Sequence, residues 1–271
     1  MISDTKVVAI GGGTGLSTML KGLKLHTHNI TAVVTVADDG GSSGILRSDL
    51  GMLAPGDVRN CVSALAEVDP VMGELLNFRF KDGSLKGHSL GNLFLAALNE
   101  TSSSFDEAVK KFSHLAGVVG TVYPVTNESV TLSALLEDGR LIEGESHIGV
   151  HHDGPKNGIV KLMVNPEKPK AVDGVIKALE KADIIVLGPG SLYTSIIPNL
   201  LVDGVVDAIK KSNAVKIYVC NIMSQAGETE NYTVSDHLAA IERHSYEGIA
   251  DIVIANNAII PESLRIKYAS E

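Results

Sequence analysis

Apolar positions along the chain fall into short buried runs separated by amphipathic stretches. Lys6–Ile10 and Ile30–Val36 are largely apolar runs rich in β-branched residues, and Leu16–Leu25 between them carries apolar side chains at helical spacing. This order predicts a βαβ unit with a right-handed crossover. The alternation resumes near the end of the chain, where Ile184–Leu187 and Lys216–Cys220 predict further buried strands. The pattern is typical of an α/β protein with a doubly wound, mostly parallel, Rossmann-like sheet.

The middle of the chain changes character twice. A polar glycine loop is predicted at Ala37–Gly44, followed by four helices, two of them capped by Ser89 and Ser104. From Gly117 to about Pro169 the pattern predicts a small antiparallel insertion, which we call the side sheet. The predicted helices are Asp57–Glu67, Met72–Phe78, Leu90–Asn99 and Phe105–Ala116, and the predicted side-sheet strands are Val118–Val125, Val130–Glu137, Leu141–Ile148 and Ile159–Val164, with a hairpin turn at Glu137–Arg140.

The last third returns to alternating helices and strands. Residues from about Tyr193 to Lys211 are expected to be mostly helical, with breaks at Pro198 and Gly204. The other predicted elements are helices at Val172–Lys181 and Val234–His244 and strands at Ile252–Ala255 and Leu264–Tyr268.

Composition fits this architecture. The chain has 271 residues, of which 44% are hydrophobic, with a mean hydropathy of +0.18, no tryptophan and 4% aromatic residues. A core with so few rings must rest on Val, Ile, Leu and Ala, which suit parallel strands covered by helices on both faces. The length suits one nucleotide-binding domain over residues 1–271, with the side sheet inserted at about 118–168.

Charge and targeting signals narrow the classes of protein. A net charge of −9 argues against a nucleic-acid groove, which needs clustered Lys and Arg. Met1 is followed by polar residues, and no apolar run approaches the roughly 20 residues of a membrane helix, so we expect a cytoplasmic protein without membrane insertion. Cys61 and Cys220 lack metal-ligand spacing and are expected to be buried thiols.

A glycine-rich turn, Gly11–Gly15, follows the first predicted strand and precedes the first helix. This arrangement points backbone N–H groups and the positive end of a helix at an anion, and glycines let a phosphate approach the backbone. Thr14 can add a hydroxyl donor. The turn is not a strict dinucleotide fingerprint, because Leu16 or Thr18 occupies the third glycine position, and no P-loop Gly-Lys-Ser/Thr follows. Alone, it indicates either a phosphate site or a tight βα turn.

Two carboxylates, Asp38 and Asp39, lie just past the second predicted strand. In an open parallel sheet, ligands bind outside the carboxyl ends of the strands. One of these carboxylates can bond a ribose, or the pair can hold Mg²⁺ beside the phosphates of a ligand. The alternative is a solvated acidic loop.

Further polar positions follow on the predicted helices and loops. Arg59 can pair with a phosphate, whereas Asp57 can simply cap the helix that it opens. His88 and Asn92 stand at the start of a helix and are the most reactive-looking pair in the middle of the chain. His151–Asp153 lacks the spacing of a helix-borne metal site and is expected to be a solvated loop.

A second glycine turn, Gly188–Ser191, follows another buried strand and repeats the anion-site logic. Because the sheet is predicted to be parallel, four strand ends deliver polar or glycine loops to one rim. The candidate ligand-binding residues are Gly12, Gly13, Thr14, Gly15, Asp38, Asp39, Ser42, Ser43, Arg59, Asn60, His88, Asn92, Gly188, Pro189, Gly190, Ser191, Tyr193 and Asn221, with Asp38 and Asp39 as the metal ligands if Mg²⁺ is used.

These residues together resemble the CofD/YvcK family, and most closely its YvcK-like branch of gluconeogenesis factors. The resemblance runs in order along nearly the whole chain. The segments that carry it are Ile10–Ser17, Val36–Gly44, Pro55–Asn60, Gly87–Asn92, Gly188–Ser195, Asn221–Gln225 and Gly227–Thr229.

The resemblance implies a Rossmann-like fold with its site at the carboxyl rim. The YvcK-like branch binds UDP-sugars such as UDP-N-acetylglucosamine, is needed for cell shape and growth on gluconeogenic carbon sources, and brings no established catalytic activity. It also implies a ligand-binding role for Tyr268. Members continue past the position of Glu271 through a segment that supplies an arginine, so reduced affinity is expected where that segment is missing. We further expect a homo-oligomer.

Two alternatives stay open. The CofD branch transfers a phospholactyl-type group from a guanylylated donor to a deazaflavin with Mg²⁺, a reaction of positioning and charge neutralisation. An aromatic-lined acceptor site would be expected, and this chain has few aromatic residues. An NAD-dependent oxidoreductase is the second alternative, weakened by the imperfect fingerprint; NAD could still enter the pocket adventitiously.

Overall fold

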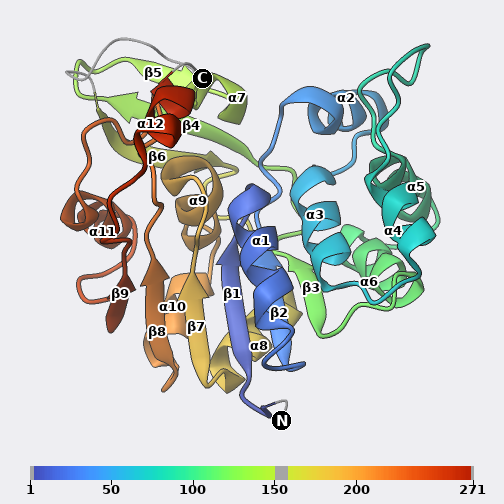
Figure 1. Cartoon of the computed structure of the whole chain (residues 1–271), viewed down its shortest axis with the longest axis horizontal. Helices are drawn as coiled ribbons and strands as arrows, with labels where there is room; N and C mark the ends of the chain where they lie inside the picture. The colour runs from blue at the N-terminus through green and yellow to red at the C-terminus, as the bar shows by residue number, and fades with distance from the viewer. Residues whose placement is uncertain (1–2, 150–157, 270–271) are drawn as a thin grey trace.

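A computed structural model of the chain describes residues 3–149 and 158–269 and is built around a six-stranded parallel sheet (Figure 1). The strand order is β3-β2-β1-β7-β8-β9, so the chain winds outward in one direction from β1 and in the other from β7. The predicted Rossmann-like fold is confirmed, with its topological switch point between β1 and β7. The strands are β1 (Val7–Gly11), β2 (Ile30–Val34), β3 (Thr121–Pro124), β7 (Ile184–Leu187), β8 (Val215–Val219) and β9 (Ile252–Ile254).

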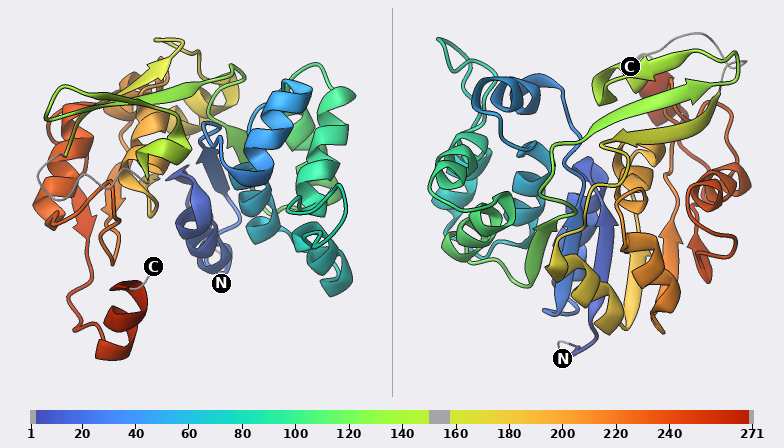
Figure 2. Two further views of the ribbon diagram at one scale, coloured as in Figure 1. Left: turned by 90° about the horizontal axis from the view of Figure 1, so that it is seen from above. Right: turned by 180° about the vertical axis from the view of Figure 1, so that it is seen from behind.

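Helices cover both faces of this sheet, as a doubly wound fold requires (Figure 2). Helices α1 (Gly13–Leu23) and α3 (Gly56–Leu65) pack against each other on one face, and α8 (Asp173–Lys181) and α10 (Val205–Lys211) on the other. Ser89 and Ser104 cap α5 and α6 as predicted, each accepting a backbone N–H three residues later. Further helices are α2 (Gly41–Leu50), α4 (Pro70–Asn77), α5 (Leu90–Glu100), α6 (Phe105–Leu115), a short π-helical turn η1 (Leu192–Ile196), α9 (Ile197–Leu200) and α11 (Val234–Arg243).

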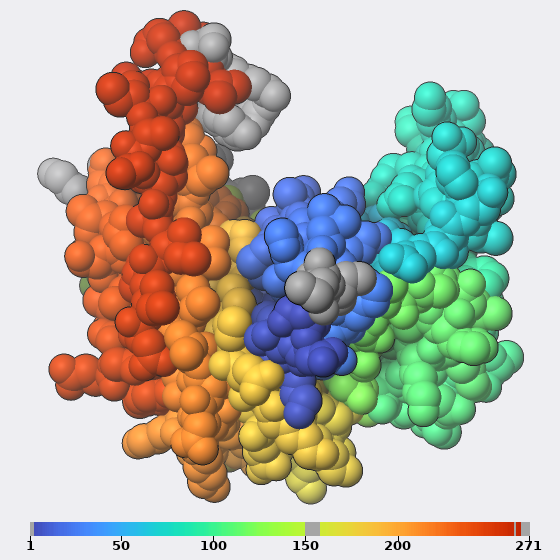
Figure 3. Space-filling model, turned by 60° about the horizontal axis from the view of Figure 1, so that its bottom comes forward, coloured from blue at the N-terminus to red at the C-terminus, as the bar shows by residue number. Residues whose placement is uncertain are grey.

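Two parts of the molecule stand out from the central sheet. One is the lobe made of α2 to α6, and the other is the C-terminal arm, residues 255–269, which ends in α12 (Glu262–Ala269). Figure 3 shows the arm and the lobe on either side of α1, with a hollow between them. No helix among the described residues is both long and apolar enough to cross a bilayer.

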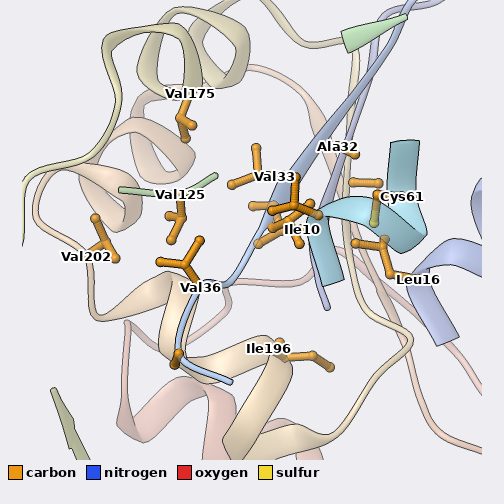
Figure 4. Packing of buried hydrophobic residues seen from close by; sticks show 14 of the residues in the cluster. Ile10, Leu16, Ala32, Val33, Val36, Cys61, Val125, Val175, Ile196 and Val202 are labelled. Atoms are coloured by element: carbon orange, nitrogen blue, oxygen red, sulfur yellow. The ribbon is translucent and has the colours of Figure 1, made fainter. Parts of the chain in front are cut away.

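The core lies where β1 and β2 meet the helices above and below them. Ile10, Val33 and Leu16 are fully buried there, as Figure 4 shows. Aliphatic side chains of this kind interdigitate closely, and each buried side chain contributes about 1.5–3 kcal/mol. Cys61 and Cys220 are free and buried, as predicted.

The side sheet crosses the carboxyl end of the main sheet (Figures 1 and 2). It has three antiparallel strands in the order β5-β4-β6, with bounds β4 (Thr131–Leu136), β5 (Leu141–Glu143) and β6 (Ile159–Asn165). The predicted hairpin turn is present, with Gly139 at φ +86°. The predicted start of the side sheet at residue 118 is wrong, because β3 pairs in parallel with β2 and belongs to the main sheet.

Two further predictions are wrong in part. The loop predicted over Ala37–Gly44 becomes α2 at Gly41, because Gly40 caps the helix in extended conformation and Ser43 and Leu46 are buried on one side. The strand predicted to reach Ile148 ends at Glu143. Gly144, at φ +92°, turns the chain into the short helix α7 (Glu145–Ile148).

The strand predicted at Leu264–Tyr268 is instead α12. The Pro261 carbonyl accepts the N–H groups of Leu264 and Arg265, which starts the helix. Proline suits a helix start because its own missing N–H would have no partner there.

Candidate functional site

The two glycine turns lie side by side at the switch point. A Cβ added to Gly15 would stand 3.0 Å from the Pro189 carbonyl oxygen, and one added to Gly190 would stand 3.2 Å from the Gly12 carbonyl oxygen. Packing of one turn on the other therefore requires glycine at both positions. From the sequence, these glycines are expected to let a phosphate approach the backbone. The close packing of the two backbones is a second reason for glycine at these positions.

The N-terminal end of α1, where the helix dipole is positive, interacts with a carboxylate of the protein itself. Gly12 caps α1 without a side-chain bond, and no acidic residue occupies the first turn of the helix. Asp57 of α3 accepts the Gly13 N–H instead, and Thr14 is exposed beside it. Burial, with the nearby charge of Asp38, raises the pKa of Asp57 from 3.8 to about 6, against the lowering effect of the Gly13 hydrogen bond.

The two adjacent carboxylates after β2 do different things. Asp38 accepts the Gly40 N–H at 2.9 Å through Oδ1, while its Oδ2 lies toward Gly56. Both oxygens of Asp39 accept backbone N–H groups of α7, from Glu145 at 2.9 Å and Ser146 at 2.8 Å. Asp39 thus caps α7 and joins the loop after β2 to the side sheet.

Arg47, which the sequence analysis did not single out, holds the loop after β2 in place. Its guanidinium donates to the carbonyls of Ala37 (2.9 Å), Asp38 (3.1 Å) and Val130 (2.7 Å). The side chain therefore holds the loop and the start of the side sheet together. No motif marks Arg47, because two of its partners lie 10 and 83 residues away in the chain.

Glu145 is a second residue that the sequence analysis missed. The Asp39 bonds place it among carboxylates, and burial together with these neighbours raises the pKa of Glu145 from 4.5 to about 8. The neighbouring carboxylates, in decreasing order of effect, are Asp38, Asp39, Glu228 and Asp57. Within residues 3–149 and 158–269, no three or more His, Cys, Asp or Glu side chains are arranged to hold a metal ion.

A chain of hydrogen bonds links α2 to the other helices of the lobe. The Ser42 hydroxyl lies 2.9 Å from His88 Nδ1 and accepts from Asn92 Nδ2 at 3.2 Å. Asn92 Oδ1 accepts from Arg59 Nε at 3.3 Å, and Arg59 also donates to Asn77 at 3.0 Å. Four predicted site residues are therefore brought together. Arg59 is 8% exposed, and burial lowers the pKa of its guanidinium.

The second glycine turn is held by the end of β8. Asn221 makes two hydrogen bonds with Gly190, accepting its N–H at 3.1 Å and donating to its carbonyl at 2.8 Å. Glu228 accepts the Tyr193 N–H at 2.9 Å and the Thr194 hydroxyl at 3.0 Å, and so supports the start of η1. Asn221 thus positions the second glycine turn.

Tyr193 is not at the rim, and its predicted ligand contact is corrected. Its side chain is fully buried, and its hydroxyl donates to the Ile159 carbonyl at 3.1 Å and lies 3.0 Å from the Tyr232 hydroxyl. The ring fastens η1 to the side sheet. Aromatic side chains whose polar end finds a partner are readily buried in this way.

The other predicted residues differ in position. Ser43 is buried, with its hydroxyl against Gly56, and Asn60 is partly buried on α3. Tyr268 belongs to α12, but its side chain lies outside the described part of the chain, as does the predicted loop at residues 151–153. A cavity of about 490 Å³ lies between the segment after β8 and α12, and it is lined by Met223, Ser224, Ala226, Glu230, Glu262, Arg265 and Ile266.

The fold and the paired turns define a Rossmann-like α/β protein with a glycine-lined switch point and a side sheet over its rim. The sequence matches the family described as 2-phospho-L-lactate transferase CofD over residues 7–271. The chain belongs to this CofD family, in the YvcK/UPF0052 group.

Relatives and a solved structure agree with this placement. A Clostridium acetobutylicum protein is 52% identical over 268 residues, which cover 99% of this chain and 59% of that protein. A Thermoanaerobacterium thermosulfurigenes protein is 54% identical, and 83% of its length is covered. The Bacillus subtilis protein named gluconeogenesis factor is 45% identical over 98% of this chain and 83% of its own length. A crystal structure of a upf0052 family member from Bacillus halodurans superposes with TM-score 0.95 at 46% identity, covering 100% of this chain and 86% of that one.

Proposed function

We propose that this chain is a cytoplasmic regulator that binds a nucleotide-sugar of the UDP-N-acetylglucosamine type and supports cell shape and growth on gluconeogenic carbon sources. The observation that carries the proposal is the pairing of two glycine turns at the switch point, where dinucleotides and nucleotides bind in folds of this kind. The gluconeogenic role comes from the name of relatives such as the Bacillus subtilis protein.

In this proposal the diphosphate lies across the two turns. Thr14 is exposed at the start of α1 and offers a hydroxyl, and Asn221 fixes the Gly190 backbone, which packs beside Gly15. Asp38 bonds the ribose. The cavity of about 490 Å³ beside α12 receives the far end of the ligand, and its size is within the usual range for small-molecule sites.

A CofD-like transferase is the second candidate, favoured by the family description. Mg²⁺ prefers oxygen ligands, and the donors at this rim are carboxylates, so the residues present fit the ion. Asp38 would hold it, since both oxygens of Asp39 already accept N–H groups. When bound, the ion would neutralise charge on the diphosphate. An NAD-dependent oxidoreductase is a third candidate with no added support from the site.

Calorimetric titration with UDP-N-acetylglucosamine tests the first proposal. We expect saturable heat for the natural sequence and at least tenfold weaker binding for Asn221→Ala, which frees the second turn. Ser48→Ala, an exposed serine on the outer part of α2, is the matched control and should bind normally. Absence of heat at millimolar UDP-sugar refutes the proposal.

Incubation with a deazaflavin acceptor, a guanylylated donor and Mg²⁺ tests the second candidate function. An unchanged acceptor excludes that function.

A further inference from the structure

One side-chain pair in the site has the geometry of an activated nucleophile. The Ser42 hydroxyl oxygen and His88 Nδ1 are 2.9 Å apart, which is within the range for proton transfer between a serine and a general base. His88 is 7% exposed, whereas Ser42 is only partly buried. The base is therefore shielded from water, and Ser42 is the more exposed residue of the pair.

The surrounding hydrogen bonds allow the Ser42 proton to point at His88. A guanidinium can only donate, so the bond from Arg59 Nε identifies the Asn92 oxygen as Oδ1 and turns the Asn92 amide nitrogen toward Ser42. That nitrogen donates to the Ser42 oxygen. The serine proton is then free to point at His88 Nδ1, which is the acceptor in the tautomer that carries its proton on Nε2.

The position of Ser42 in the fold also favours attack on an anionic centre. Ser42 stands in the first turn of the ten-residue helix α2, whose cap, Gly40, makes no side-chain bond and whose first turn has no acidic residue. The N–H groups at such a helix start favour negative charge. The neighbouring Ser43 packs on Gly56, next to the Asp57 that bonds Gly13. Ser42 is therefore on the same rim as the first glycine turn.

We propose that Ser42 is a nucleophile and His88 its general base, and that the pair cleaves the diphosphate of a nucleotide-sugar bound at this rim. This inference rests on the proposed function, which supplies the substrate class, and adds an activity to it. The protein would then hydrolyse the ligand that it detects.

The reaction needs only water besides the ligand. In the first step the Ser42 oxygen forms a bond to one phosphorus, the bridging P–O bond breaks, and the serine proton passes through His88 Nδ1 to the departing phosphate. In the second step water attacks the same phosphorus and gives a proton to His88, the P–O bond to Ser42 breaks, and the serine oxygen takes that proton. The products are a nucleoside monophosphate and a sugar phosphate.

A purely structural role makes a different prediction. If the pair only ties α2 to the start of α5, any side chain that accepts the Ser42 hydrogen bond should serve as well as His88. Asparagine offers its Oδ1 near the position of His88 Nδ1 but is not a base. His88→Asn therefore separates the two roles, since it keeps the hydrogen bond and removes proton transfer.

The experiment combines a nucleotide-independent probe with turnover. The protein is treated with an alkyl fluorophosphonate, and the labelled peptide is identified by mass spectrometry. We expect the label on Ser42, its loss in Ser42→Ala, and labelling about 10²–10⁴-fold slower in His88→Asn with an unchanged melting temperature. Ser48→Ala should label at the natural rate. In parallel, release of UMP from UDP-N-acetylglucosamine is followed, with binding measured separately by calorimetry.

The outcomes are distinct. Equal labelling of the natural protein and His88→Asn, or no label on Ser42, overturns the nucleophile–base pair. UDP-sugar binding without UMP release overturns the cleavage and leaves the proposed function standing. Absence of UDP-sugar binding overturns the proposed function and the substrate assigned here, whereas the labelling result still decides the Ser42–His88 pair.

Discussion

Gly12 is the position where a single added methyl group should reveal most about the switch point. Its backbone is extended, at φ −173°, so alanine meets no backbone strain there. A Cβ at Gly12 would nevertheless stand 2.5 Å from Asp57 Oδ2 and 2.7 Å from Thr35 Cγ2. The Asp57 carboxylate can swing aside, but Thr35 is 3% exposed and its branched side chain has little rotational freedom.

The size of the effect follows from these contacts. Ordinary carbon contacts are about 3.5–4.0 Å, so the Thr35 methyl or the strand beneath it must move by nearly an ångström. Forced overpacking of a well-packed site costs about 1–3 kcal/mol. For a domain of this length that corresponds to a melting temperature lower by about 2–6 °C. We also expect weaker nucleotide-sugar binding, because moving Asp57 disturbs the start of α1.

Urea unfolding of the Gly12→Ala variant measures this loss of stability, with Gly22→Ala as the control. Gly22 lies in the same helix and is exposed, and a Cβ there has no atom within 4 Å. Alanine is the better helix former, so Gly22→Ala should be more stable than the natural protein by about 0.5–1 kcal/mol. If Gly12→Ala unfolds at the urea concentration of the natural protein, then the packing of this turn is looser than we infer.

Three further substitutions test the acidic rim and the second turn. Glu145→Gln removes a carboxyl whose raised pKa makes the folded state bind a proton more tightly than the unfolded state. The natural protein should therefore lose stability relative to this variant as the pH rises from about 4.5 to 8. At ~1.4 kcal/mol per pH unit, the largest possible loss is about 5 kcal/mol. If the free energies of unfolding of the two proteins depend on pH in the same way, the pKa of Glu145 is not raised. Asp39→Ala removes both hydrogen bonds that cap α7 and should lower the free energy of unfolding in urea by about 1–2 kcal/mol. Amide hydrogen exchange at Glu145 and Ser146 should become faster, and unchanged exchange would argue against the cap. Asn221→Ala removes two hydrogen bonds to Gly190 and should lower the free energy of unfolding by about 1–3 kcal/mol. A melting curve at fixed pH measures this loss. An unchanged melting temperature would show that the second glycine turn is stable without Asn221.

The sequence predicts those parts of the fold that depend on neighbouring residues. The β-branched runs at β1, β2 and β7 and the caps at Ser89 and Ser104 need only a few adjacent positions, and the structure confirms them. The alternation of strands and helices is enough to indicate a parallel sheet. Its parallel order also explains why the ends of β1, β2, β7 and β8 meet at one rim.

The residues that the sequence analysis missed depend on contacts between distant segments. Glu145 reaches the rim because its N–H bonds Asp39, 106 residues earlier, and Arg47 joins residues that precede and follow the lobe in the sequence. Tyr193 was misplaced for the opposite reason. It lies two residues after a glycine turn, but the direction of its side chain is set by the Ile159 carbonyl in the side sheet, which no local pattern reveals.

The contact between the two glycine turns also limits how the protein can change over evolutionary time. At Gly15 and Gly190 the obstructing atoms nearest to a new side chain include the backbone of the opposite turn, which no substitution at that opposite position can remove. Every replacement of glycine adds at least a Cβ, so a compensating second mutation is not available one step away. The two turns should therefore be conserved together, although 172 residues lie between Gly15 and Gly188 in the sequence. New ligand preferences in such a protein should arise in the surrounding loops and in the side sheet, while the floor of the site stays the same.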